Sequence, residues 1–415
     1  MKRAMELQIP VNGLKGLSPL VNLPEFDLVH GQAVEYMHCI LLGVTRQIAD
    51  LWFDPSNSQE AFYLGSPSLV AKVDARLTTI CPPDLITRLP RSLRERAFWK
   101  ATEWRNWLLY YSLPCCLGVL HSRYWSHFAL LVEAIFTLLT EELSPGDLTH
   151  AGNLLQRFVS RTAGLYGVKS LTFNVHLLQH ITSSVKNLGP LWSHSAFVFE
   201  GGNGTLLKHV TAAKGVPSQI IERIAMSQQL TEHLFIHPPS PNILELCQDM
   251  LGYKKIIKSR VIDGARIFGN PRLSVLLSNA ENLALNAFCP GWKDVVEYFR
   301  FAHLGTVFWS SQYSKGKKKD CSVFESKDGK TYIIDRIFEI SGFHGTPSLL
   351  LLCKKQVATD SSVSFPCHII ECFISLETTI TVVPLSDIVK PSVFIDFRDE
   401  QKQYVCAVPN LVERD

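Results

Sequence analysis

The stretch IHPPSPN, residues 236–242, separates two parts of the sequence that follow different hydrophobic patterns. It holds three prolines within four residues, and proline restricts its own backbone and that of the residue before it, so we expect an extended connection. Apolar residues recur at helical spacing before this stretch, and short apolar runs alternate with turn residues after about 305. The change predicts an α+β protein, with a mainly helical N-terminal region followed by a small antiparallel β-rich C-terminal domain.

The helical region is predicted from apolar stripes. In HGQAVEYMHCILLGVTRQIADLW, residues 30–52, apolar residues recur at spacings of three and four, which places one apolar face on a helix. Residues 122–142 are apolar almost all round, which is typical of a buried central helix. A further stripe over 171–188 is followed by Gly189, a helix-ending residue. Other helices are expected at 98–112, 146–165 and 217–235.

The β-rich domain is predicted from a hairpin and the short runs that follow it. CSVFESKDGKTYIIDRIFEI, residues 321–340, reads as two strands joined by a turn at Asp328 and Gly329. Later runs that read as strands lie at 348–355, 367–374, 378–385, 392–397 and 403–408. They predict a small antiparallel barrel or sandwich. We divide the chain into a helical region at 1–235, a proline-rich seam with a basic helical linker at 236–304, and a β-rich domain at 305–415.

The composition indicates a folded intracellular protein. The chain is 46% hydrophobic and 19% charged, which excludes a disordered or fibrous chain. Its formal net charge of +3 is too small for an overall nucleic-acid signature, so any such contact must be local. No apolar run reaches the roughly 18 residues of a membrane span, the start lacks the apolar segment of a signal peptide, and the eleven cysteines are scattered. We expect no membrane partner, and a nuclear or cytoplasmic location.

Basic residues concentrate in two stretches. YKKIIKSRVIDGARIFGNPR spans 253–272, and YSKGKKKD spans 313–320. Such patches contact phosphates without reading base sequence, although a solvated surface is the alternative interpretation. The expected nucleic-acid-binding residues are Lys254, Lys255, Lys258, Arg260, Arg266, Lys315, Lys317, Lys318 and Lys319.

Two polar features point to chemistry in the helical region. Glu35 and His38 lie three residues apart and share a helix face, so the acid can orient the imidazole near a catalytic centre. The alternative is a core histidine with its hydrogen bonds satisfied. Glu200 follows the apolar residues 197–199, which should partly desolvate it and raise its proton affinity unless a cation or metal compensates. An ordinary position in the first turn of a helix explains Glu200 equally well.

Histidines and cysteines offer weaker metal patterns. His176 and His180 lie four residues apart and could bind one zinc ion with Glu200 as the third ligand, but the glutamate of the usual zinc-protease helix is absent. Hydrogen bonding between helices is the alternative. Cys367 and Cys372, with the adjacent His368, lack the spacing of a zinc knuckle, so we expect core cysteines.

Two longer stretches share motifs with one family. LPEFDLVHGQAVEYMHCILLGVTRQIADLWF, residues 23–53, holds E-Y-M-H, then G-V and L-W. NVHLLQHITSSVKNLGPLWSHSAFVFEGGNGTLLKHV, residues 174–210, holds G-P, F-V-F-E and N-G-T-L-L-K. In content, order and separation these blocks resemble transposases of the CACTA (En/Spm) superfamily. The resemblance covers roughly 8–235, with a weaker similarity through the β-rich tail.

The resemblance implies an RNase H-like core, of which this chain would hold the helical insertion and the last helix. In such enzymes two aspartates and a later glutamate bind two Mg²⁺ ions for strand cleavage. Glu200 matches the catalytic, metal-binding glutamate and His38 the histidine of an acid-x-x-His element, while Glu35 stands where the family usually has Asp. The two aspartates have no counterpart, because Asp27 does not resemble either context. We expect a chain truncated at its N-terminus relative to the family, with no stable hold on Mg²⁺ and no strand transfer by itself.

Three functions follow from these patterns. The first is a transposable-element-derived protein, the remnant of a DDE transposase, that binds DNA, with self-association and a chromatin or nuclear protein as further partners. The second is a protein-interaction module of a domesticated transposase. The third is a zinc-dependent hydrolase built on His176, His180 and Glu200.

Overall fold

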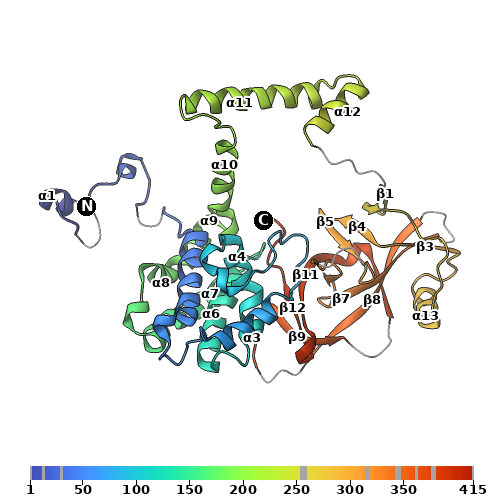
Figure 1. The fold of residues 1–415 in the computed structure, drawn as a ribbon, viewed down its shortest axis with the longest axis horizontal. Coiled ribbons are helices and arrows are strands. Elements are labelled where there is room, and N and C mark those ends of the chain that lie inside the picture. The colour runs from blue at the N-terminus through green and yellow to red at the C-terminus, as the bar shows by residue number, and fades with distance from the viewer. Residues whose placement is uncertain are drawn as a thin grey trace.

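The computed structural model describes residues 2–11, 15–28, 31–252, 259–313, 318–341, 347–359, 363–374 and 380–413. It confirms the α+β organisation, with helices first and antiparallel sheets after residue 258 (Figure 1). The described helical region carries no sheet, so the RNase H-like core stays a prediction. The α-helices are α1 Lys2–Leu7, α2 Arg46–Phe53, α3 Pro67–Leu77, α4 Ala101–Asn106, α5 Ser112–Cys116, α6 Ser122–Leu138, α7 Pro145–Tyr166, α8 Phe173–Leu177, α9 Ile181–Leu188, α10 Phe197–Leu207, α11 Val216–Thr231, α12 Pro241–Met250 and α13 Asn279–Phe288.

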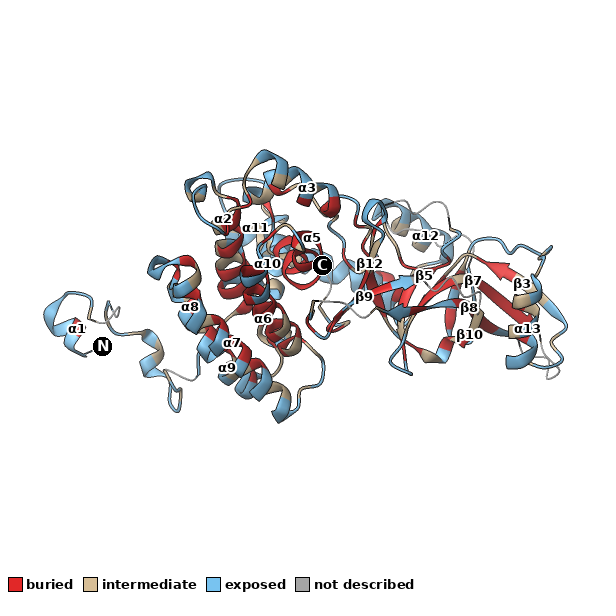
Figure 2. Cartoon of the chain, turned by 90° about the horizontal axis from the view of Figure 1, so that it is seen from below, coloured by how far each residue is buried: buried red, intermediate tan, exposed pale blue. Residues whose placement is uncertain are grey.

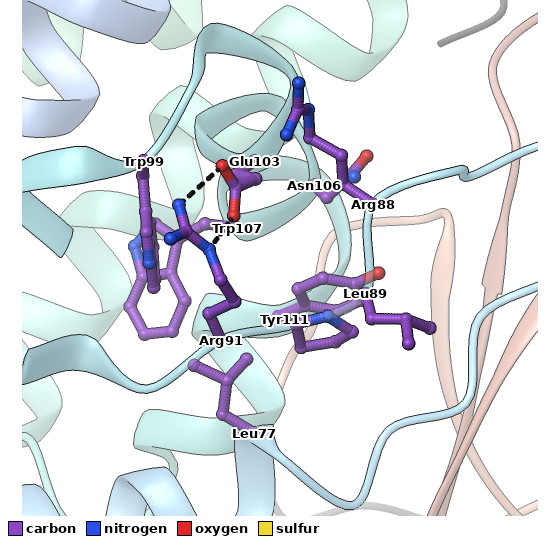
Figure 3. Close-up of a pocket in the computed structure, with 10 residues that line it drawn as sticks. Leu77, Arg88, Leu89, Arg91, Trp99, Glu103, Asn106, Trp107 and Tyr111 are labelled. Carbon is purple, nitrogen blue, oxygen red and sulfur yellow. Dashed lines mark hydrogen bonds and ion pairs between the residues drawn. The ribbon is translucent and has the colours of Figure 1, made fainter. Parts of the chain in front are cut away.

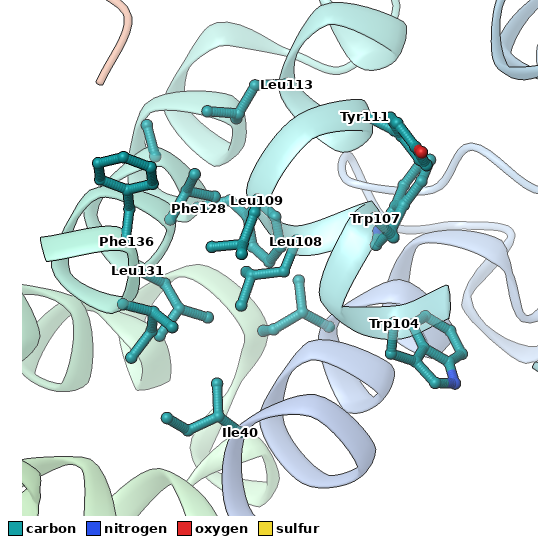
Figure 4. Packing of buried hydrophobic residues seen from close by; sticks show 14 of the residues in the cluster. Ile40, Trp104, Trp107, Leu108, Leu109, Tyr111, Leu113, Phe128, Leu131 and Phe136 are labelled. Atoms are coloured by element: carbon teal, nitrogen blue, oxygen red, sulfur yellow. The ribbon is translucent and has the colours of Figure 1, made fainter. Parts of the chain in front are cut away.

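The helical body is built around α6, as its apolar sequence predicts. Phe128, Leu131 and Phe136 of α6 face Leu108 and Leu109 of the neighbouring π-helix Trp107–Tyr111 (Figure 4). The helix α7 packs along α6, and a second π-helix, Met37–Thr45, runs directly into α2. In Figure 2 the buried residues gather in α6 and its neighbours, whereas α1 is largely exposed.

The apolar stripe over 171–188 is not one continuous helix. A tight 3₁₀ turn, Leu178–His180, interrupts it between α8 and α9. Val175, Ile181 and Val185 are nevertheless all buried, because the tighter turn keeps the stripe on one side. Gly189 ends α9 with φ of 90°, as predicted. Gly43 allows the close packing of α8, since a Cβ there would lie 2.5 Å from the side-chain nitrogen of Asn174.

An arm of three helices extends from this body. α10, α11 and α12 contain no buried residue and project beyond the other helices (Figure 1). The extended connection expected over 236–242 is shorter than predicted, because α12 already begins at Pro241. Proline suits the first turn of a helix, where its missing N–H group is not needed.

The strands begin earlier than the sequence analysis predicted. We expected helical structure up to about 300, but four strands lie between 259 and 303. Asp263 and Gly264 form the turn of the first hairpin with φ of 48° and 76°, so they supply the two positive φ values that a tight hairpin turn needs. The strands are β1 Ser259–Ile262, β2 Ala265–Phe268, β3 Asp294–Tyr298, β4 Arg300–His303, β5 Thr306–Trp309, β6 Val323–Ser326, β7 Thr331–Ser341, β8 Pro347–Ala358, β9 Ile369–Ile374, β10 Ile380–Pro384, β11 Ile388–Phe397 and β12 Lys402–Ala407.

Six of the strands form a closed antiparallel ring. Pairing runs from β6 to β7, β8, β9, β12 and β11 and back to β6, and the predicted hairpin at Asp328 and Gly329 joins β6 to β7. β3 and β10 add to β7 and β8. A separate sheet in the order β1-β2-β4-β5 shares an apolar cluster with β6, β7 and β8, and Leu285 of α13 packs against another part of β7 and β8.

The closed ring of six strands and the helical body share one apolar core. Tyr404 and Cys406 of β12 belong to the same buried cluster as the helices. The ring of His368 stacks on that of Phe136, with their centres 3.8 Å apart. Arg76 of α3 binds both carboxylate oxygens of Glu400 at 2.6 Å. The β-rich part therefore completes the core of the helical part.

Candidate functional site

The structure brings together the three residues that the sequence marked as catalytic. His38 Nδ1 lies 2.7 Å from Glu35 Oε2, and His38 Nε2 lies 3.5 Å from Glu200 Oε1. The imidazole thus stands between two carboxylates, one from the start of the π-helix Met37–Thr45 and one from the first turn of α10. A carboxylate that holds one ring nitrogen orients the imidazole and supports proton transfer at the other nitrogen.

Glu35 also fixes the start of α10. Its Oε1 accepts hydrogen bonds from the backbone N–H groups of Met37 and Ala196, both at 2.9 Å. Ala196 lies 161 residues along the chain from Glu35 and immediately precedes α10. One carboxylate therefore caps the π-helix and holds the helix that carries Glu200.

Replacing Glu35 with alanine is expected to lower the free energy of unfolding by about 1–2 kcal/mol, because two helix starts lose their acceptor. The measurement is urea unfolding, together with hydrogen exchange at the Ala196 amide, which should become faster. Glu60→Ala is the control, since Glu60 is an exposed acid outside this cluster. Unchanged exchange at Ala196 in Glu35→Ala would show that the contact does not hold α10.

The site lies at the surface, which corrects one expectation. The side chains of His38 and Glu200 are 59% and 58% exposed. Val198 and Phe199 point away from any core and are 76% and 72% exposed, so they do not desolvate Glu200. The physical reason is that α10 belongs to the projecting arm. Burial lowers the pKa of the nearby His194, with the Glu35 carboxylate acting in the opposite direction.

The described residues do not assemble the metal sites considered from the sequence. Within these ranges no group of three or more His, Cys, Asp or Glu side chains is placed to hold a metal ion. The rings of His176 and His180 meet edge to face at 5.2 Å, while Glu200 pairs with His38. Magnesium prefers oxygen ligands, and here the His38 imidazole lies between the Glu35 and Glu200 carboxylates, so this arrangement does not fit that ion.

The predicted core cysteines are confirmed only in part. Cys372 and His368 are buried, and His368 Nε2 lies 3.0 Å from the Leu109 carbonyl oxygen. Cys367 is exposed, which was not expected. It lies in the turn that precedes β9, whereas we expected it within a strand.

Four of the predicted nucleic-acid-binding residues lie in the described chain. Arg260 already binds Glu339 Oε1 at 2.7 Å and the Tyr298 hydroxyl at 3.2 Å, and Lys319 donates to the Ile86 carbonyl oxygen. Arg266 and Lys318 are exposed, so they can reach a phosphate without breaking such contacts. The other five lysines lie outside the described residues: Lys254, Lys255, Lys258, Lys315 and Lys317.

Sequence reasoning missed the residues that surround Arg266. Phe268 pairs with Arg300 and Arg266 pairs with Ala302, so these side chains share one face of the β1-β2-β4-β5 sheet. The Arg300 guanidinium lies 4.8 Å from the centre of the Tyr313 ring and 6.0 Å from that of Phe268. We call Arg266, Phe268, Arg300 and Tyr313 the basic sheet face. The turn at 263–264 was the signal that could have revealed it.

Comparisons with known proteins add no relative. No family model matches the chain, and no match was found among curated proteins or among solved structures. None of the described helices is both long and apolar enough to cross a membrane. The resemblance to CACTA transposases therefore rests on the two sequence blocks alone.

Proposed function

We propose that this chain is a transposable-element-derived protein, the remnant of a DDE transposase, that binds nucleic acid without carrying out strand transfer by itself. The observation that supports this most is the meeting of the two sequence blocks at one site. Their acid-x-x-His element and their glutamate lie far apart in the chain, yet His38 reaches both Glu35 and Glu200. The spacing of residues within each helix does not by itself bring His38 to Glu200.

The side chains around Glu200 argue against strand transfer by this chain alone. Two-metal strand transfer needs several carboxylates around two divalent ions about 4 Å apart. Glu200 instead faces an imidazole, and the described ranges hold no such carboxylate group. The cluster of Glu35, His38 and Glu200 then serves to position the arm.

The basic sheet face is the surface that we assign to nucleic acid. Arg266 and Arg300 supply positive charge on one face of a sheet, and Phe268 and Tyr313 add aromatic rings next to it. Cations neutralise phosphates, and aromatic rings stack on unpaired bases. A chain with a formal net charge of +3 can bind nucleic acid only through such a local concentration.

Arg266→Ala is expected to weaken nucleic-acid binding by a similar factor for every sequence and to reduce the slope of log affinity against log salt by about 1. Fluorescence anisotropy with a labelled oligonucleotide over a salt series measures both. Arg398→Ala is the matched control, because Arg398 is 88% exposed but lies outside the basic sheet face. Affinity that does not depend on salt in the unmodified protein would contradict the proposal.

Absence of catalysis needs its own assay. The protein is incubated with Mg²⁺ or Mn²⁺ and supercoiled DNA, and we expect no nicked or joined product. Cleavage that depends on the metal and disappears in Glu200→Gln would show instead that the chain assembles an active centre.

One observation favours protein interaction as a second function. The arm exposes large apolar side chains along three helices, including Ile221 at 68%, Met226 at 66% and Met250 at 80%. Apolar surface of this kind is typical of partner binding. A partner that co-purifies after nuclease treatment and is lost in Ile221→Ser with Met226→Ser would favour this function over nucleic-acid binding.

A further inference from the structure

A small aromatic pocket lies in the helical body, away from the Glu35–His38–Glu200 cluster. Trp99 and Trp107 form one side, and Asn106 and Arg88 lie on the opposite side (Figure 3). The empty space between the lining side chains is about 240 Å³, including the open mouth. Glu103 and Asn106 come from α4, and Trp107 and Tyr111 from the π-helix Trp107–Tyr111, whereas the other polar and aromatic groups come from the segment 88–99 before α4. π-Helical turns often occur at functional sites.

The pocket contains an unusual set of buried polar groups without partners. The Asn106 side chain is buried to 99%, since its residue is only 1% exposed, and within the described chain neither Oδ1 nor Nδ2 has a hydrogen-bond partner. The indole N–H groups of Trp99 and Trp107 are buried and unpaired in the same way. Buried polar groups in folded proteins are normally satisfied by protein, water or ligand. Four such atoms lie in the walls of one space, where an occupant, of which a single water is the smallest, can satisfy them once a lining side chain moves.

The lining selects the chemistry of that occupant. A buried primary amide offers one acceptor and two donors, which pair side by side with the edge of a nucleobase. Trp99 and Trp107 place their rings 5.9 Å apart at 58°, and indole rings stack on flat heteroaromatic rings. Arg88 is exposed at the Asn106 side of the pocket, where a guanidinium can bind a phosphate.

Two other ligand classes fit less well. An organic cation would meet Arg88 and Arg91, and the pocket's carboxylate, Glu103, is already neutralised by Arg91 at 2.6 and 2.9 Å. A hydrocarbon would leave the Asn106 amide unpaired. We propose that this pocket binds one nucleobase, presented by a nucleotide or by an unpaired position in nucleic acid. The inference deepens the proposed function, since it gives a nucleic-acid partner a second contact.

Entry of the base requires one side chain to move. With Arg91 in place, the pocket leaves about 10 Å³ for the centre of a water molecule, which is room for a single water. The Arg91 side chain is 35% exposed, so it can turn outward, and an N–H donor of the base must then replace it at the Glu103 carboxylate, which is only 7% exposed. The base then takes the space beside Asn106, and the Asn106 amide donates to and accepts from its edge.

Titration with nucleoside monophosphates tests the pocket directly. Tryptophan fluorescence and calorimetry follow the binding of the four common monophosphates, with ribose 5-phosphate as a ligand that lacks a base. We expect saturable binding of at least one monophosphate, a loss of at least about tenfold in Asn106→Leu, and no binding of ribose 5-phosphate. Arg88→Ala should weaken the monophosphate but not the matching nucleoside, whereas the exposed Arg94→Ala should change neither.

Stability separates loss of binding from loss of folding. Asn106→Leu replaces an unpaired buried amide with an apolar side chain of similar size, so we expect the Tm of the free protein to rise by about 2 °C. A lower Tm, no saturable binding of any monophosphate at millimolar concentration, or binding that Asn106→Leu leaves unchanged would overturn the inference. So would a crystal grown with the nucleotide that holds only an ordered water in the pocket.

Separate measurements test where the base comes from and whether the proposed function holds. Weaker binding of a single strand, but not of a full duplex, by Asn106→Leu assigns an unpaired base of nucleic acid, whereas an effect on monophosphates alone assigns a free nucleotide. If monophosphates fail while polymers still bind through Arg266, the pocket inference is wrong and the proposed function stands. If monophosphates bind and polymers do not, the pocket inference stands and the proposed function is wrong.

Discussion

Replacing Arg336 with methionine is expected to lower the free energy of unfolding by about 3 kcal/mol. Arg336 of β7 binds Glu297 Oε1 at 2.7 Å and Glu281 Oε1 at 2.9 Å, and these two carboxylates are 1% and 9% exposed. Removing the cation leaves two buried negative charges, and Arg272, at 3.3 Å from Glu297, compensates only one of them. Methionine keeps most of the volume, so the loss reports charge rather than packing.

Urea unfolding measures this effect, and the slope with urea should stay unchanged. Arg398→Met is the matched control, because Arg398 is 88% exposed and an ion pair of so exposed a side chain contributes little. Burial by itself raises the pKa of Glu281, but the Ser278 backbone and Arg336 outweigh it and hold the pKa below its ordinary value. Equal stability of the two variants would mean that the buried network contributes no more than a surface pair.

Lowering the pH from 7 to 5 is expected to lower the free energy of unfolding by about 3–4 kcal/mol through two buried histidines. Burial lowers the pKa of His127 to about 4 and that of His368 to about 3, with backbone contacts to Phe158 and Leu109 acting in the opposite direction. In the unfolded chain each histidine keeps the ordinary pKa near 6.5. Between this pKa and the lower pKa of the folded state, the unfolded chain therefore binds more protons than the folded chain. Stability is therefore full above pH 7 and falls as the pH decreases through 6.5.

The test is urea unfolding at several pH values between 5 and 7. His127→Gln combined with His368→Gln should remove most of the slope, whereas His180→Gln, at an exposed position, should leave it intact. A flat profile in the unmodified protein, or the same slope in the double variant, would show that these two rings are not kept neutral by the fold.

Local patterns were sufficient to predict most elements, and they failed where two local signals competed. The all-round apolar sequence of α6 and the Asp328–Gly329 turn led directly to a central helix and a hairpin. The same kind of turn at Asp263 and Gly264 was overlooked, because basic residues around it suggested a helical linker. Pro241 was interpreted as part of an extended seam, although it also suits a helix start.

The sequence predicted which residues form the candidate site, but it did not predict that the site is exposed. Spacing placed Glu35 beside His38, and the family resemblance added Glu200, which the structure brings within 3.5 Å of His38. Exposure of that site follows from the projection of α10, which no local pattern encodes. The Asn106 pocket was missed for a similar reason, since an asparagine in a helix does not reveal whether tertiary contacts satisfy its amide.

The core shared by the two parts of the chain has a consequence for protein synthesis. Arg76 and Glu400 are 324 residues apart in the chain, and His368 and Leu109 are 259 apart. The helices leave the ribosome long before the strands that cover them, so their apolar surface must wait, unprotected, for most of translation. A helical half made without the last strands would therefore expose the apolar residues that β12 covers in the full chain.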